Sequence, residues 1–158
     1  GRQREPEIPV VSFLYEVAGA LPDSVVDVPE FAVAFGLFLK QAEEERLHAM
    51  KFVQYVVDTK GALRIPAIPA PRAAFGSAEE AVEAALTWEN EVTRQVTRLM
   101  DLAVKANDYL AQSFLQWFID EQLEEVVKMD RLYTVIKQSG EKNLLMVEAY
   151  LVHLEKAQ

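Results

Sequence analysis

The sequence predicts an all-α protein, a four-helix bundle with one long crossover and a short fifth helix at its C-terminal end. Apolar residues recur in alternating steps of three and four over three long stretches, which is the spacing of one face of an α-helix. A connector of about 18 residues follows the first stretch and, at up to ~3.3 Å per residue, can run the length of a bundle, so the flanking helices can lie parallel. A short turn joins the second and third stretches, which makes that pair antiparallel.

An atypical N-terminal segment, residues 1–28, precedes the long helices. It carries Pro6 and Pro9 among charged residues and is expected to begin as an extended lead-in. A short helix is predicted from about residue 10 to residue 21, where Pro22 stops it.

The first long helix is predicted from about residue 29 to Asp58. Residues 27–30, with the sequence DVPE, place a capping acid before a proline in the first turn and a glutamate three positions after the cap. Roughly 30 residues at 1.5 Å each give a helix of about 45 Å. The connector that follows, residues 59–76, is broken by one glycine and three prolines, Gly61, Pro66, Pro69 and Pro71.

The other two long helices are bounded by equally clear signals. Ser77 and Glu80 form a capping box at the start of a helix that ends near residues 107–108. The next helix is predicted from about 109 to 138, before Gly140 breaks it.

The whole chain of 158 residues, 51% hydrophobic, is expected to be one domain, with a bundle core over 29–138 and the fifth helix within 142–156. A net charge of -9 argues against a nucleic-acid partner and favours cations. With no cysteine, the chain has no disulfide, thiolate metal site or thiol nucleophile. No membrane span or secretory signal is expected, which favours an intracellular, cytoplasmic protein without excluding an organelle.

Acidic residues interrupt the apolar stripe of all three long helices. The first stripe comprises Phe31, Phe35, Phe38, Ala42, Glu45, Ala49, Phe52 and Val56. The second comprises Val82, Ala85, Glu89, Val92, Val96, Leu99 and Ala103. The third comprises Leu115, Phe118, Gln122, Glu125, Met129, Leu132 and Ile136. Three helices are therefore expected to direct carboxylates at one interior.

A metal ion is the simplest partner for these acids. An isolated buried carboxylate costs several kcal/mol, and Lys and Arg are sparse on the stripes. His48 follows Glu45 by one helical turn, so both side chains can reach one ion. Several carboxylates and one imidazole suit a hard or borderline metal such as iron or manganese. Gln122 would be a weaker ligand, or a core amide satisfied by its neighbours.

Less specific interpretations apply to several of the same residues. Residues 43–46 could be a solvated charge run, and His48 could be a hydrogen-bonded core histidine. Glu44, Glu121 and Glu124 flank the stripes, and are either surface charges or an adjoining, weaker cation site.

Three blocks of sequence resemble ferritins of the non-haem bacterial type: residues 44–50 (EERLHAM), 86–89 (LTWE) and 114–125 (FLQWFIDEQLEE). The resemblance runs from about residue 29 to the C-terminus. It implies a ferritin-like fold and a di-iron centre that oxidises Fe(II) with O2. The implied catalytic ligands are Glu45, His48, Glu89 and Gln122, with Glu125 assisting. It also implies storage of ferric mineral in a 24-subunit shell of this chain or related subunits, closed by the fifth helix.

Two features separate the chain from bacterioferritin, the haem-binding relative. That group repeats Glu-x-x-His on its fourth helix, where this chain has Gln122 and Glu125. It also places a haem-ligating methionine directly after the second-helix glutamate, where this chain has Arg46. No haem is therefore expected.

The N-terminal segment departs from the ferritin pattern. Ferritins carry a glutamate in the middle of a long first helix, whereas here Glu7 lies between prolines and Glu16 has the wrong helical phase. The first iron site is expected to lack its usual terminal ligand. The acidic three-fold pore of the family falls on Gln112 and Leu115, which are not acidic.

Three other functions remain open from the sequence. The chain could be a structural subunit of a ferritin shell that oxidises iron poorly, or a non-storage di-iron oxidase or peroxidase on the same bundle. A metal-free helical interaction module is the third, and it leaves the acids on three apolar stripes unexplained.

Overall fold

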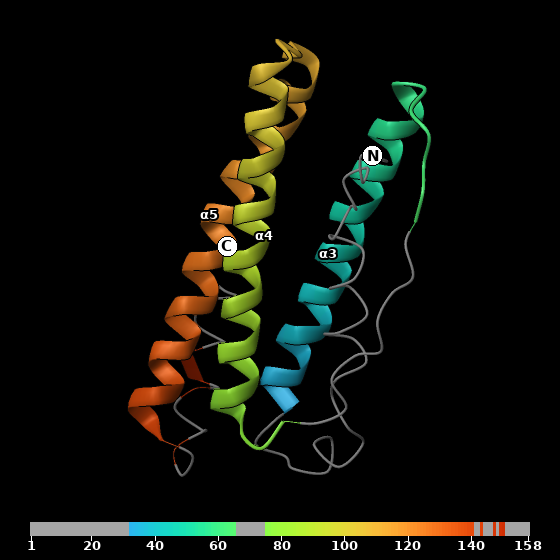
Figure 1. Cartoon of the computed structure of the whole chain (residues 1–158). Coiled ribbons are helices and arrows are strands. Elements are labelled where there is room, and N and C mark those ends of the chain that lie inside the picture. The colour runs from blue at the N-terminus through green and yellow to red at the C-terminus, as the bar shows by residue number, and fades with distance from the viewer. Residues whose placement is uncertain (1–31, 66–74, 141–142, 144–146, 148, 151–158) are drawn as a thin grey trace. The chain divides into compact units, whose positions relative to one another are not determined.

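The computed structural model describes residues 32–65, 75–140, 143, 147 and 149–150, and no strand occurs among them. Its three long helices are α3 (Ala32–Asp58), α4 (Ala78–Lys105) and α5 (Tyr109–Ser139) (Figure 1). The chain divides into two compact units, 1–75 with α3 and 76–158 with α4 and α5. None of the described helices is both long and apolar enough to cross a membrane.

Helix α3 ends at Asp58, as the sequence predicts. The amide of Gly61 donates to the carbonyl of Val56 at 2.8 Å, and that of Lys60 to the carbonyl of Val57 at 3.0 Å. This pair of bonds is the Schellman motif, and Lys60 takes its left-handed position with φ of 58°. Gly61 has little room for a Cβ, which would lie 3.0 Å from Cγ1 of Val56 and 3.2 Å from its carbonyl oxygen.

Helix α4 starts with the predicted cap. Ser77 has an extended backbone, and its hydroxyl oxygen accepts from the amide of Glu80 at 3.1 Å. The reciprocal bond differs from the usual capping box, because the Glu80 carboxylate accepts from Gly76, one residue earlier, at 2.6 Å.

The turn between α4 and α5 is encoded by Asn107 and Asp108. Asn107 occupies the left-handed position with φ of 53°, and the amide of Asp108 donates to the carbonyl of Ala103 at 2.9 Å. The side chain of Asp108 then caps α5 by accepting from the amide of Ala111 at 2.9 Å. The two helices consequently run antiparallel and lie side by side (Figure 1).

The buried faces of α4 and α5 follow the predicted stripes closely. All seven residues expected on α5 are buried, and so are those expected on α4 except Leu99, which is half-buried. Gln95 is buried in addition. Met129 and Leu132 are almost completely inaccessible, and full burial of such a side chain contributes about 1.5–3 kcal/mol.

Several predicted elements lie outside the described residues. These are the N-terminal segment with its short helix, the start of the first long helix before residue 32, and 66–74 of the connector. Within the predicted fifth helix the structure describes 143, 147 and 149–150, of which the last three are helical, and Val147 is buried. The single domain stays a prediction.

Candidate metal centre

Helix α3 supplies a buried carboxylate and imidazole one turn apart. Glu45 is 3% exposed and His48 is 7% exposed. The Nδ1 atom of His48 lies 3.5 Å from Oε1 of Glu45, so the two side chains lie on the same face of the helix. Both offer donor atoms that bind Fe(II), and their helical spacing holds them close together.

Gln41 is a further polar residue of this face that the sequence did not indicate. It is buried, and its Nε2 atom donates to Oε1 of Glu45 at 3.3 Å. Its position one turn before Glu45 indicates that it lies on the same face of the helix. The apolar stripe, however, was assigned through the neighbouring Ala42, so Gln41 was passed over. Gln41 therefore holds the Glu45 carboxylate through a neutral donor.

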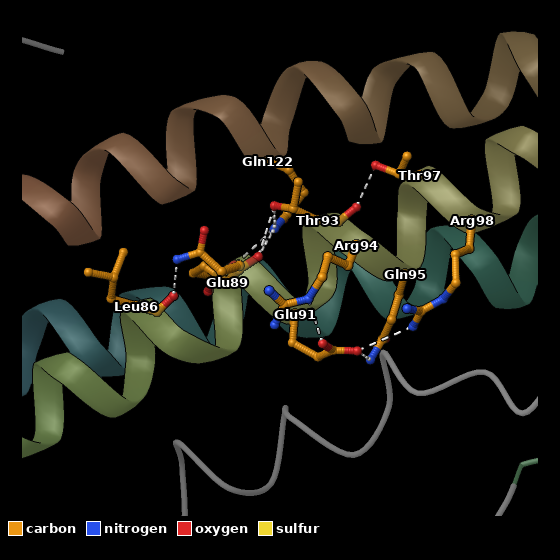
Figure 2. Close-up of polar contacts among 10 residues, drawn as sticks. Leu86, Glu89, Glu91, Thr93, Arg94, Gln95, Thr97, Arg98 and Gln122 are labelled. Carbon is orange, nitrogen blue, oxygen red and sulfur yellow. Dashed lines mark hydrogen bonds and ion pairs between the residues drawn. The ribbon is translucent and has the colours of Figure 1, made fainter.

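In the second unit, Glu89 of α4 and Gln122 of α5 meet although 33 residues separate them. Both are buried, and Nε2 of Gln122 donates to Oε2 of Glu89 at 3.1 Å and to its backbone carbonyl oxygen at 3.1 Å (Figure 2). Oγ1 of Thr93 lies 3.4 Å from the same nitrogen. A hydrogen bond to a charged group is worth about 1.5–3 kcal/mol, so this contact links the two helices strongly. The amide carries no charge, so this contact adds no cation beside the carboxylate.

Glu125 has a cationic partner, although few were expected for the acids of the stripes. It is buried, and its Oε2 atom lies 3.4 Å from Nζ of Lys128, one turn along α5. Lys128 is off the apolar stripe, and its flexible side chain reaches back to the buried carboxylate. Glu125 is thus a partly neutralised ligand candidate.

The flanking acids are less buried than the stripe positions. Glu44 and Glu121 are half-buried, whereas Glu124 is exposed. Glu43 is exposed and pairs with Arg46 at 3.1 Å. Within residues 43–46 the helical phase thus separates one buried carboxylate, Glu45, from its neighbours, as predicted.

A separate polar cluster surrounds Glu91 on α4 (Figure 2). Its carboxylate accepts from Gln95 at 3.1 Å and pairs with Arg94 at 2.9 Å and Arg98 at 3.2 Å. The amide of Gln95, and then the two guanidinium groups, lower the pKa of Glu91 below its usual 4.5. Carboxylate charge is therefore balanced here, and this cluster offers no cation site.

The structure thus brings the predicted residues together as two pairs, Glu45 with His48 and Glu89 with Gln122. The pairs belong to different units. Among the described residues, no three His, Asp or Glu side chains are grouped so as to hold a metal ion. The complete ligand set remains a prediction.

Residues 23–139 match the model of the ferritin-like domain family, and the chain belongs to this ferritin family. Ferritin BfrB of Mycolicibacterium smegmatis is 38% identical over 125 residues, which cover 79% of this chain and 67% of that protein. The bacterial non-heme ferritin of Staphylococcus saprophyticus is 38% identical over 104 residues, 66% of this chain and 62% of that one.

The fold comparison agrees. An open pore ferritin from the archaeon Archaeoglobus fulgidus superimposes with a TM-score of 0.77 and 25% identity, over 90% of this chain and 86% of that one. The predicted fold class, an all-α bundle of the ferritin type, is therefore confirmed.

Proposed function

We propose that the chain is an iron-storage ferritin subunit that oxidises Fe(II) with O2 at a di-iron carboxylate centre and stores ferric mineral within a hollow shell. Membership of the ferritin family supports iron as the substrate. The proposed ligands are Glu45, His48, Glu89 and Gln122, with Glu125 assisting.

The observation that carries the proposal is how the carboxylates of Glu45 and Glu89 are held. Glu45 and Glu89 are each almost fully buried, and each accepts a hydrogen bond from a neutral amide, of Gln41 and Gln122 respectively. An amide fixes the position of a carboxylate and adds no positive charge beside it. Such preoriented anionic oxygens favour a hard cation, and they favour Fe(III) over Fe(II) because the interaction grows with charge.

The roles of the residues follow from this preference for Fe(III) over Fe(II). Glu45 or Glu89 would bridge two iron ions, and His48 would complete one of the sites. Stabilising the ferric product lowers the free energy of electron transfer from Fe(II) to O2, and no protein nucleophile is required. The half-buried Glu44 and Glu121 would form an adjoining weaker site.

The assembly proposed is a shell of 24 copies of this chain or of related subunits. The predicted fifth helix is too short and apolar to be stable alone in water, so it is expected to be buried between copies. No haem is proposed, since Arg46 occupies the position of the haem-ligating methionine of bacterioferritin, and Gln122 and Glu125 occupy the positions of its second Glu-x-x-His pair.

A structural subunit with slow oxidation is the alternative function, favoured by two observations. Lys128 partly neutralises Glu125, and Gln122 contributes no charge. Both reduce the anionic field that favours Fe(III).

Stopped-flow measurement of Fe(II) oxidation tests the proposal. Glu45→Ala removes a shared ligand and is expected to reduce the rate of the first turnover by at least about 10-fold, whereas the exposed Glu43→Ala is expected to match wild type. Glu7→Ala tests whether the N-terminal segment supplies a ligand. Wild-type protein that oxidises iron no faster than buffer would contradict the oxidase function and favour the structural subunit.

A further inference from the structure

The amide nitrogen of Gln122 is surrounded by acceptors from α4 (Figure 2). They are the backbone oxygen of Glu89 at 3.1 Å, its Oε2 atom at 3.1 Å and Oγ1 of Thr93 at 3.4 Å. Every hydrogen bond that the Gln122 side chain makes to described residues runs through this nitrogen.

Thr93 is an acceptor at this site because its own proton is already used. Its hydroxyl donates to the backbone oxygen of Glu89, four residues earlier, at 2.9 Å. A hydroxyl has one proton, so the side of Oγ1 that faces Gln122 presents a lone pair.

This arrangement selects one of the two orientations of the Gln122 amide. The two ends of the amide have nearly the same shape, but only the oxygen Oε1 can bind a cation. Rotation by 180° would place Oε1 against three acceptors, where lone pairs oppose lone pairs. With the nitrogen turned toward Glu89 and Thr93, Oε1 is turned away from them.

We infer that Thr93 is a positioning residue that holds the Gln122 amide with its nitrogen toward α4, which leaves the Oε1 atom as the metal-binding end. This inference rests on the proposed function. It gives Gln122 a definite ligand atom, and it makes a residue that touches no metal necessary for metal affinity.

Anaerobic titration with Co²⁺, followed by its visible absorption, tests the inference without turnover. Thr93→Val keeps the shape of the side chain and removes the hydroxyl, and it is expected to weaken Co²⁺ binding about 10-fold. Thr93→Ser restores the hydroxyl and is expected to bind within about two-fold of wild type. The matched control is Thr97→Val, since the hydroxyl of Thr97 makes the same intrahelical bond, to the carbonyl of Thr93 at 2.8 Å, on an exposed position.

A double-mutant cycle separates positioning from a general loss of stability. Once Gln122→Ala has removed the amide, Thr93→Val is expected to have no further effect on Co²⁺ affinity. Additive losses would overturn the inference, and so would wild-type affinity in Thr93→Val. Thr93→Ala, which removes the hydroxyl with a different change in volume, must weaken binding as well, or the inference fails.

The same titration keeps the two proposals apart. If wild-type protein binds no Co²⁺, or if Glu89→Ala binds it normally, the proposed metal centre itself is wrong. If wild type and Glu89→Ala behave as expected while Thr93→Val matches wild type, only the role of Thr93 is wrong.

Discussion

Replacing the buried carboxylate of Glu89 by the isosteric amide, Glu89→Gln, is expected to stabilise the metal-free protein and to abolish most of its stabilisation by metal. Glu89 is 1% exposed and accepts a hydrogen bond from Gln122 at 3.1 Å. The new amide keeps a carbonyl oxygen that can accept this bond.

The magnitude follows from two opposing contributions. A hydrogen bond to a charged group is worth about 1.5–3 kcal/mol and a neutral one about 0.5–1.5 kcal/mol, so roughly 1 kcal/mol is lost. Removing a buried charge relieves a desolvation cost of several kcal/mol. The metal-free variant is therefore expected to gain about 1 kcal/mol or more, which raises the melting temperature by about 2–4 °C per kcal/mol for a chain of this length.

Metal binding should also stabilise the wild-type protein. At 100 times its dissociation constant, a ligand adds about 2.7 kcal/mol, which corresponds to roughly 5–11 °C. Glu89→Gln is expected to lose most of this increase because a shared anionic ligand is gone.

Calorimetry at one fixed protein concentration, with chelator and then with anaerobic Fe(II), measures both effects. Asp101→Asn removes the same charge from an exposed position of α4 and is expected to behave as wild type in both conditions. The reasoning fails if Glu89→Gln melts below wild type in chelator, or if it keeps the full increase with Fe(II).

Three further predictions concern other parts of the chain. Glu91→Gln should make the free energy of unfolding depend less on pH in acid. The folded-state pKa of Glu91 is lowered, so its contribution to stability is present above about pH 4.5 and is lost as the pH falls below that value. Urea titrations at several pH values measure this difference. Asn107→Ala should cost about 1 kcal/mol because φ is positive, while Asn107→Gly should cost less, and equal urea midpoints would contradict this. Deletion of residues 141–158 should weaken assembly, which light scattering measures; an unchanged number of subunits per particle would refute a role in shell closure.

Local signals were sufficient to predict α4 and α5. The hydroxyl of Ser77 caps one helix, Asp108 caps the other, and Asn107 accepts the left-handed conformation between them. These preferences involve residues within four positions of each other, so the sequence contains them completely. The period of the apolar residues likewise identified the faces on which Glu89 and Gln122 are buried.

The polar contacts were not predictable in the same way. Gln95 was not singled out and is buried, and the pairing of Glu125 with Lys128 was missed. A stripe ranks positions by hydropathy, so it passes over an amide that is buried, and it does not indicate how far a long lysine side chain reaches.

The sequence by itself determined where the long helices run, where they end and which faces carry the carboxylates, because periodicity and capping are properties of neighbouring residues. Only the tertiary structure decided how the Glu89 carboxylate is held. The orientation of the Gln122 amide depends on three acceptor atoms from a different helix, contributed by Glu89 and Thr93. A hydrogen bond has direction, and that direction is defined only when donor and acceptor are placed in space.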